Sequence, residues 1–343
     1  MAKIILDNHK IIGDYLKPYI VAEVNSSHNG DVNIAKQMVM SAKECGCDCV
    51  KFQSWSAESL YSKTHYEQNP VAKRIIQKFS FSEEKLFEIA QYCNDLEIDF
   101  SSTPYSEKEV DFLVNECNVP FIKIASMEIN NYDYLHYIAS KNKPVVLSTG
   151  MADMGEIEKA IQIFEDVGNT KIVLLHCVSI YPAQPSIINL NNIHGFREAF
   201  PKYPIGFSDH TLGSEIASAS IAMGACLIEK HFTLDNTKMG MDNNMATEPE
   251  KMKELVRYCH NVYQSMGTQT RVISQQEQEQ RQKMRRSVIA TQNLAKGTVI
   301  EKTHLGLKRP GTGFSAENLH KLIGRSLCNN VEKDALLTES DFI

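Results

Sequence analysis

Eight short apolar runs between residues 20 and 229 constrain the fold of this chain more than any other feature. Buried parallel strands read as continuous apolar runs, and here a helical pattern or a long loop follows each run. We expect strands at Ile20–Glu23, Cys49–Gln53, Asp99–Ser101, Phe121–Ile124, Pro144–Leu147, Ile172–His176, Ile205–Ser208 and Leu227–Glu229. This alternation predicts an α/β fold of the (β/α)8 TIM-barrel type.

The segments between the runs favour the same fold. Helical periodicity is clearest in Asn33–Glu44, Glu107–Cys117, Met154–Val167 and Ser214–Met223. A doubly wound sheet is the structural alternative, but no G-x-G-x-x-G follows the first run, and a sheet of about five or six strands would leave two runs unexplained. Residues 54–97 exceed the length of one helix, so they either shape a pocket on the barrel rim or form a plain loop.

A second, smaller domain is expected after the barrel. We place the barrel at residues 1–270, a polar linker at 271–286 and a C-terminal domain at 287–343. The linker is rich in Gln and Glu and polar on every side, which suits a helix that bridges two domains. Pieces with β character at Val288–Ala290 and Thr298–Ile300 indicate a small β fold, marginal in length for a core of its own.

Composition and charge exclude several functional classes. Lys and Arg total 36 against 42 Asp and Glu, a net charge of −6, so the chain lacks the basic field of a nucleic-acid binder. No apolar run approaches the ~20 residues of a membrane span, and Asp7 comes before a signal-peptide core could form. We expect a cytoplasmic protein whose nine cysteines act as small apolar residues.

Polar, reactive residues lie at the end of every predicted strand, which is where a TIM barrel carries its active site. Chance would scatter such residues over both ends of the barrel, so this pattern indicates an enzyme. The residues are Glu23, Lys51, Gln53, Thr103, Lys123, Ser126, Glu128, Ser148, His176, Ser179, Tyr181, Ser208, His210, Glu229 and His231.

Two of these histidines form a candidate metal site. His210 and His231 follow adjacent strands, close enough to share one divalent ion whose coordination shell substrate or water would complete. The alternative is a pair of hydrogen-bonded structural histidines.

Two lysines form a candidate anion site. Lys51 and Lys123 face the barrel interior, and buried lysines are rare unless they are paired. A phosphate or carboxylate ligand is therefore expected, while ion pairs with Glu23 and Glu128 are the structural alternative. Both glutamates, with Asp242, are also candidates for proton transfer or for binding sugar hydroxyls.

A series of short motifs covers nearly the whole chain. They are Ala22-Glu23, His28-Asn29-Gly30-Asp31, Val50-Lys51-Phe52-Gln53, Ser102-Thr103-Pro104, Lys123-Ile124-Ala125-Ser126, Leu147-Ser148-Thr149-Gly150-Met151-Ala152, Leu175-His176-Cys177, Tyr181-Pro182, Ser208-Asp209-His210-Thr211, Ile228-Glu229-Lys230-His231-Phe232 and Lys308-Arg309-Pro310-Gly311-Thr312-Gly313. Together they resemble the sialic acid synthases, which condense phosphoenolpyruvate with an N-acylated mannosamine-type sugar. The last motif resembles the antifreeze-like (SAF, β-clip) domain attached to these barrels.

The resemblance assigns roles by position. It implies a divalent ion, usually Mn²⁺ with Mg²⁺ or Co²⁺ as alternatives, on His210 and His231. It implies that Glu23, Glu128, Lys51 and Lys123 are catalytic. The implied phosphoenolpyruvate contacts are Lys51, Thr103, Lys123, Ser126, Ser148 and Ser208. The implied sugar-side residues are Glu23, Gln53, Glu128, Ser179, Tyr181, Asp242 and Arg309. It further implies a homodimer with exchanged C-terminal domains, in which Arg309 reaches the active site of the neighbouring subunit.

The chain departs from the family pattern on the sugar side, at Asn25, Ser27, Ser179 and Met241. The acceptor therefore stays open between N-acetylmannosamine, its 6-phosphate (an N-acylneuraminate-9-phosphate synthase) and a 2,4-diacetamido-trideoxy hexose (a legionaminate or pseudaminate synthase). A barrel isomerase or lyase acting on a sugar alone would not need two inward lysines. A carbohydrate- or ice-binding module would leave the polar strand ends unexplained.

Overall fold

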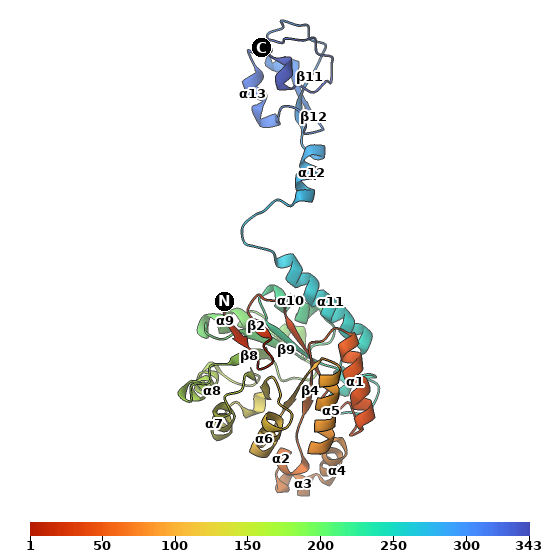
Figure 1. Ribbon diagram of the computed structural model, residues 1–343, viewed down its shortest axis with the longest axis vertical. Coiled ribbons are helices and arrows are strands. Elements are labelled where there is room, and N and C mark those ends of the chain that lie inside the picture. Colours follow the sequence, from red (N-terminus) through yellow and green to blue (C-terminus); the bar gives the residue numbers. More distant parts are fainter. The chain divides into compact units, whose positions relative to one another are not determined.

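The computed structural model describes residues 1–343 and divides into two units, Met1–Gly267 and Thr268–Ile343. The centre of the first unit is a sheet of eight parallel strands, one at each predicted position (Figure 1). They are β3 (Tyr19–Glu23), β4 (Cys49–Gln53), β5 (Asp99–Thr103), β6 (Ile122–Ile124), β7 (Val145–Ser148), β8 (Ile172–Cys177), β9 (Ile205–Asp209) and β10 (Leu227–His231). The TIM-barrel prediction is confirmed.

The strand register brings the strand ends to a common rim. The first and last barrel strands, β3 and β10, pair in parallel with Glu23 opposite His231. The hydrogen-bonded order runs from β5 through β4, β3, β10, β9, β8 and β7 to β6. Between the two outer strands of this order, Ser101 Oγ on β5 donates to the carbonyl of Phe121, just before β6, at 3.0 Å.

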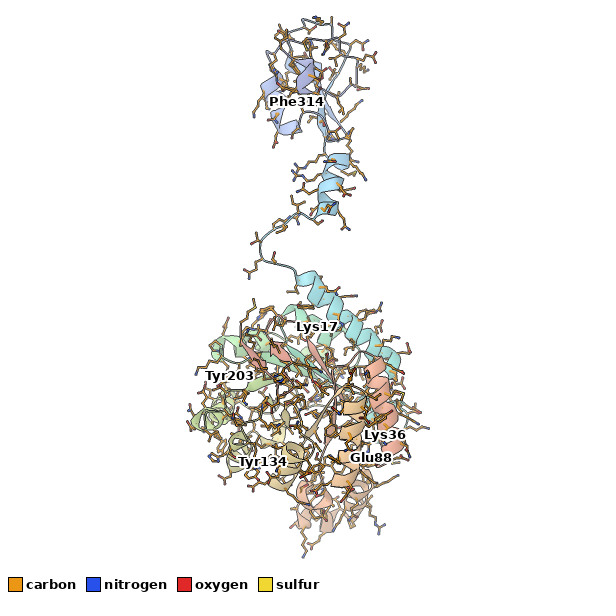
Figure 2. All side chains as sticks on the ribbon, viewed as in Figure 1. Lys17, Lys36, Glu88, Tyr134, Tyr203 and Phe314 are labelled. Carbon is orange, nitrogen blue, oxygen red and sulfur yellow. The ribbon has the colours of Figure 1, made fainter.

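Helices surround these strands (Figure 1). They are α1 (Val32–Glu44), α5 (Glu83–Asp95), α6 (Glu107–Asn115), α7 (Tyr132–Ser140), α8 (Met154–Asp166), α9 (Asn192–Ala199), α10 (Glu215–Ala222) and α11 (Pro249–Met266). α1 begins where the Asp31 carboxylate accepts hydrogen bonds from two backbone N–H groups of the first turn. On the outer side, Lys36 of α1 pairs with Glu88 of α5 at 2.6 Å (Figure 2). None of the helices is both long and apolar enough to cross a membrane.

The long segment after β4 is mostly helical, so the plain-loop alternative is wrong. It contains α2 (Ala57–Leu60), α3 (Lys63–Gln68) and α4 (Pro70–Phe79) before α5. Trp55, Tyr66, Ile76 and Phe79 form a small buried cluster that holds these helices together. Apolar burial of this kind gives a long connection a fixed shape, which a polar loop of the same length would lack.

An N-terminal hairpin was not predicted. It consists of β1 (Lys3–Ile5) and β2 (Ile11–Gly13), which pair antiparallel. Ile4, Leu6 and Ile12 are buried in one cluster with the first residues of several barrel strands. Three-residue strands are too short for an alternating pattern to stand out in a sequence.

The second unit has its own small core. It contains α12 (Gln275–Met284), β11 (Ser287–Ala290), β12 (Leu305–Lys308) and α13 (Leu319–Leu322), with β11 antiparallel to β12. The polar helix expected in the linker is α12, which buries no residue. The strand expected at Thr298–Ile300 is wrong, since Val299 makes only an isolated bridge to Ser326. A lone bridge gives no ladder, so Ile300 is buried as a core residue of an irregular segment.

Candidate active site

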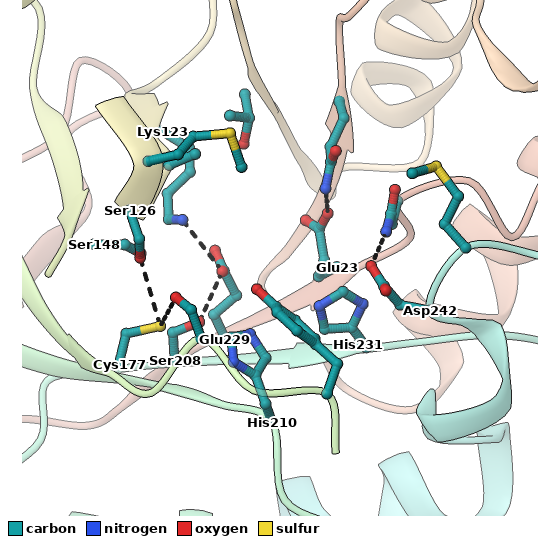
Figure 3. Close-up of a pocket in the computed structure, with 18 of the residues that line it drawn as sticks. Glu23, Lys123, Ser126, Ser148, Cys177, Ser208, His210, Glu229, His231 and Asp242 are labelled. Carbon is teal, nitrogen blue, oxygen red and sulfur yellow. Dashed lines mark hydrogen bonds and ion pairs between the residues drawn. The ribbon is translucent and has the colours of Figure 1, made fainter. Parts of the chain in front are cut away.

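A cavity of about 400 Å³ at the carboxyl ends of the barrel strands collects most of the predicted site residues (Figure 3). All but two of the residues assigned a role from the sequence line it. They are Glu23, Lys51, Gln53, Thr103, Lys123, Ser126, Ser148, Ser179, Tyr181, Ser208, His210, His231 and Asp242.

Lys51 is buried in the floor of the cavity and paired with two carboxylates. Its ammonium group contacts Glu23 directly and lies 3.7 Å from Glu229 Oε2. It also donates to Thr103 Oγ1 at 3.0 Å. Burial alone would lower the pKa of Lys51, but Glu229 and Glu23 together raise it above its ordinary value. Lys51 is therefore a cation throughout the neutral range, and the predicted pair with Glu23 is present.

Lys123 faces the same carboxylate from the opposite side of the barrel. Its Nζ lies 3.3 Å from Glu229 Oε1, and no ion pair joins it to Glu128, the partner that the sequence alternative named. Burial lowers the pKa of Lys123, Glu229 opposes this shift, and Lys51 adds to it. The two lysines thus have different proton affinities, because Lys51 has two carboxylates beside it and Lys123 has one.

Glu229 links both lysines, with Nζ atoms at 3.7 and 3.3 Å. Ser208 Oγ donates to the same carboxylate at 3.0 Å (Figure 3). Burial would raise the pKa of Glu229, but Lys123 and Lys51 outweigh it and lower the pKa to about 2. In contrast, burial raises the pKa of Glu23; Lys51 opposes this shift, and the neighbouring Glu229 adds to it. The site therefore pairs one carboxylate that is always ionised with one that gives up its proton less readily.

Ser148 is the clearest sign that this floor binds a ligand. Its hydroxyl is buried and has no hydrogen-bond partner within the protein. Leaving a buried hydroxyl unpaired costs about 1–3 kcal/mol, so such groups usually acquire a partner from water or from a ligand. Together with Lys51, Lys123 and Thr103, it offers the donors that an anion with several oxygens requires.

His210 and His231 are neighbours at the rim, with ring centroids 5.4 Å apart. Nδ1 of His210 lies 2.8 Å from the carbonyl of Val178, so this nitrogen carries the proton and donates, leaving Nε2 free. Burial, with His210 next in importance, lowers the pKa of His231 well below its usual range. His231 is therefore neutral at ordinary pH.

Burial would lower the pKa of His210, but the neighbouring Cys177 and the carbonyl of Val178 outweigh it and raise the pKa. Imidazole nitrogens of two adjacent histidines are ligands that a divalent ion accepts once both rings are deprotonated. No group of three or more His, Cys, Asp and Glu side chains in the chain could hold a metal, so an ion here would take its other ligands from substrate and water.

Asp242 lies beside the histidines and is held by a residue far away in the sequence (Figure 3). Asn25 Nδ2 donates to Asp242 Oδ2 at 2.5 Å, and the backbone N–H of Met241 donates to Ser26 Oγ at 3.1 Å. These two bonds join the loop after β3 to the loop after β10. Burial raises the pKa of Asp242, with His210 and Asn25 opposing the shift.

Comparison with known proteins gives the family. Residues 38–271 match the NeuB family, and residues 285–343 match the SAF domain. The first match alone covers more than half of the chain. The chain belongs to the NeuB family.

Relatives of this NeuB-family chain are similar over nearly its whole length. The N,N'-diacetyllegionaminic acid synthase of Legionella pneumophila is 37% identical, over 95% of this chain and 94% of the relative. The human N-acetylneuraminate-9-phosphate synthase is 34% identical, over 94% of this chain and 91% of the relative. A crystal structure of an N-acetylneuraminic acid synthetase from Leptospira borgpetersenii, in complex with citrate, is 32% identical, with a TM-score of 0.74 over 81% of this chain and 94% of the other. The predicted family and its SAF domain are confirmed.

Two predicted residues of this NeuB-family chain lie outside the cavity. β6 ends at Ile124, and a 3₁₀ turn at Ser126–Glu128 follows. Glu128 is not among the lining residues, and its carboxylate accepts a hydrogen bond from Asn131 Nδ2 at 2.9 Å. Arg309 lies in the second unit, directly after β12, and is exposed. Their predicted roles stay predictions.

Glu229, Tyr105 and Cys177 are among the lining residues to which the sequence assigned no role. Glu229 was noted only as a strand end, and its bridging position requires the pairing of β9 with β10. Tyr105 donates from its hydroxyl to Gln53 Oε1 at 3.1 Å. Cys177 contacts Ser126 and Ser179 through its sulfur (Figure 3). Its pKa, which burial would raise, is lowered mainly by the neighbouring His210.

Proposed function

We propose that this chain condenses phosphoenolpyruvate with N-acetylmannosamine or a related N-acylated sugar and releases phosphate. This is the reaction of an N-acetylneuraminate (sialic acid) synthase-type, metal-dependent, C–C bond-forming transferase. The observation that carries the proposal is the pair of buried lysines, Lys51 and Lys123, beside an unpartnered hydroxyl at the carboxyl end of the barrel. The similarity to an N,N'-diacetyllegionaminic acid synthase and an N-acetylneuraminate-9-phosphate synthase supports it.

The lysines and hydroxyls would hold the two anionic groups of phosphoenolpyruvate. Lys51 and Lys123 already face carboxylates, so a bound phosphate or carboxylate would compete with Glu229 and Glu23 for the same ammonium groups. Charge-assisted hydrogen bonds to ammonium groups are among the strongest that a protein offers an anion. Thr103, Ser126, Ser148 and Ser208 would supply the neutral donors.

His210 and His231 would hold the divalent ion, most simply Mn²⁺, with Mg²⁺ or Co²⁺ as alternatives. When bound, such an ion supplies Lewis-acid polarisation of a carbonyl oxygen. The chain's own side chains would carry out every other part of the chemistry.

In the proposed reaction a bond forms between C3 of phosphoenolpyruvate and the aldehyde carbon of the open-chain sugar. The aldehyde oxygen takes up a proton and becomes a hydroxyl, while positive charge builds on C2. Water adds to C2 and loses one proton. The new C2 hydroxyl then loses its proton as the carbonyl forms, and the bond from C2 to the phosphate oxygen breaks, so that inorganic phosphate leaves. Glu229 is ionised at all ordinary pH values and would stabilise the charge on C2. Glu23, with its raised pKa, is the better candidate to move the proton of the attacking water. Glu128 does not line the cavity, so its role in proton transfer stays a prediction.

The cavity favours an unphosphorylated acceptor. Lys51 and Lys123 are the only Lys or Arg side chains that line it, and both belong to the phosphoenolpyruvate site. A sugar 6-phosphate would need a further cation beyond the two lysines of the cavity lining.

A second candidate acceptor is a 2,4-diacetamido-trideoxy hexose, the substrate of a legionaminate or pseudaminate synthase. Met127, Met151 and Met241 line the cavity and are each more than two-fifths exposed. Thioether side chains offer an adaptable apolar surface, which suits an acetyl methyl or the methyl group of a deoxy sugar. Gln53, Ser179, Tyr181 and Asp242 would bind the remaining polar groups of either acceptor.

The proposed assembly is a homodimer with exchanged C-terminal units, in which Arg309 completes the partner's site. The support from this chain is that Arg309 is exposed after β12 and that α12, which precedes its domain, buries no residue.

An acceptor panel tests the proposed function. Phosphate release from phosphoenolpyruvate should depend on the sugar and should be faster with N-acetylmannosamine or the 2,4-diacetamido-trideoxy sugar than with N-acetylmannosamine 6-phosphate. Release with the 6-phosphate alone would overturn the acceptor assignment. Release without any sugar would overturn the function.

A further inference from the structure

A fully buried ion pair lies behind the two histidines, outside the cavity. Lys230 on β10 places its Nζ 2.6 Å from Asp209 Oδ2 on β9, and the two side chains are 1% and 0% exposed. Neither residue lines the cavity. The chemistry proposed above gives this pair no role.

The register of the two strands links the pair to the histidines. Lys230 and Asp209 are direct partners across the parallel β9–β10 ladder. Because side chains alternate along a strand, His231 and His210 point to the cavity while the residue before each points to the layer between strands and helices. Figure 3 shows the cavity side of this arrangement, with Ser208 of β9 and His210, directly after that strand, beside Glu229 and His231 of β10.

The same network holds the residue after His210. Thr211 donates to Asp209 Oδ1 from its backbone N–H at 2.9 Å and from its hydroxyl at 2.8 Å. Its carbonyl accepts from Lys230 Nζ at 2.6 Å. The backbone on both sides of His210 is therefore tied to β10 through charged hydrogen bonds.

Stability alone does not explain this pair. Taking two charges out of water costs about as much as their attraction returns, and well-packed apolar residues of similar size often serve as well or better. What the pair supplies, and an apolar pair would not, is a directional bond of fixed length between β9 and β10. That bond lies one residue before each histidine.

We propose that the Asp209–Lys230 pair is a positioning device. It fixes the distance between His210 and His231 and the orientation of their rings, so that both can bind one divalent ion. This inference rests on the metal role in the proposed function. Partners outside the coordination shell typically change metal affinity by about 10- to 100-fold when removed. Removal of the Asp209–Lys230 pair should therefore change the metal affinity by about 10- to 100-fold.

The test is the dissociation constant for Mn²⁺ of the full chain, measured by electron paramagnetic resonance of the free ion. The double variant Asp209→Asn/Lys230→Met removes both charges together and keeps an acceptor for Thr211, so no unpaired charge is left buried. We expect about 10- to 100-fold weaker Mn²⁺ binding with a circular-dichroism spectrum like that of the wild type. A folded double variant with wild-type Mn²⁺ affinity would overturn the proposal.

A matched control and a second variant complete the design. Glu165→Gln/Lys202→Met removes an ion pair of 3.0 Å in which Lys202 is 73% exposed, and it should leave Mn²⁺ affinity unchanged. If the double variant does not fold, Lys230→Arg keeps the charge but not its position, so unchanged Mn²⁺ affinity in that folded variant would overturn the proposal. Absence of Mn²⁺ binding by the wild type would overturn the metal role itself, before any substitution is made.

Discussion

Nζ of Lys123 lies 3.3 Å from Oε1 of Glu229, across the floor of the barrel. The contact joins a strand of one half of the barrel to a strand of the other, and both side chains are nearly inaccessible to water. In the protein without ligand, the carboxylate thus faces the ammonium group that the proposed anionic substrate would bind. Glu229 is the counter-ion of both lysines, and in the proposed reaction it would also be the negative charge beside the reacting carbon.

Lys123→Ala should weaken phosphoenolpyruvate binding by about 10- to 100-fold, since a charge-assisted contact contributes about 1.5–3 kcal/mol. Isothermal titration calorimetry measures this affinity directly. Lys63→Ala, which changes a lysine with a 90% exposed side chain, is the control and should bind as the wild type does. Unchanged affinity in both Lys123→Ala and Lys51→Ala would move the anion site elsewhere.

His28 should make the protein more stable at neutral pH than in mild acid. It is 2% exposed, stacks on Phe81 with centroids 3.9 Å apart, and accepts the N–H of Gly30 at Nδ1. Burial lowers the pKa of His28 from 6.5 to about 3. Because the pKa of His28 is lower in the folded protein, the unfolded chain binds the proton first as the pH falls. The stability that depends on a neutral His28 is therefore complete above pH 6.5 and is lost as the pH falls toward 3.

His28→Leu should therefore reduce the difference in unfolding free energy between pH 7 and pH 4 by about 3 kcal/mol. Urea titrations at both pH values measure this difference. His136→Leu, on the exposed side of α7, is the control and should leave it unchanged. An equal pH dependence in wild type and His28→Leu would contradict the assignment of a neutral, buried imidazole.

Most of the barrel could be predicted from the sequence because its strands are buried on both faces and read as continuous apolar runs. β8, with every residue buried, is the clearest case. The N-terminal hairpin and the short helices after β4 could not be predicted, because each is stabilised by contacts with distant residues rather than by its own pattern. Thr298–Ile300 shows the opposite error, since apolar residues there serve the core without forming a ladder.

The sequence predicted which residues belong to the site but not which of them contact one another. Strand ends gave Lys51, Lys123, His210 and His231, since a parallel barrel brings all strand ends to one rim. The role of Glu229 depends on which residue lies opposite it across the barrel, a relationship that spacing along the chain does not contain. Glu128 follows a strand end as closely as the others do, but a 3₁₀ turn takes it out of the cavity lining.

Chelation should abolish turnover, and Mn²⁺, Co²⁺ or Mg²⁺ should restore it. The reason is that His210 and His231 are neighbours, with ring centroids 5.4 Å apart, and would hold the ion that polarises the aldehyde in the proposed reaction. Turnover assays after dialysis against a chelator check this, and His231→Ala should lose activity while its circular-dichroism spectrum stays that of the wild type. Full activity in the chelated enzyme would rule out the metal.

Mixing two inactive variants tests the exchanged dimer. Arg309→Ala and His231→Ala, refolded together, form mixed dimers in which one site receives intact histidines and an intact Arg309. With random pairing, activity should return to about a quarter of the wild-type value, because half of the dimers are mixed and each has one complete site. Mixed dimers as inactive as their parents would place Arg309 in its own barrel or outside the site.

The identity of the product tests the central claim most directly. The wild-type enzyme is incubated with Mn²⁺, an N-acylated acceptor sugar and phosphoenolpyruvate carrying oxygen-18 at its bridging oxygen, and the products are analysed by mass spectrometry. A condensation predicts a product with the mass of the acceptor plus that of pyruvic acid, one inorganic phosphate per product, and the label in the phosphate. An acceptor of unchanged mass, or label left in the organic product, would contradict the account.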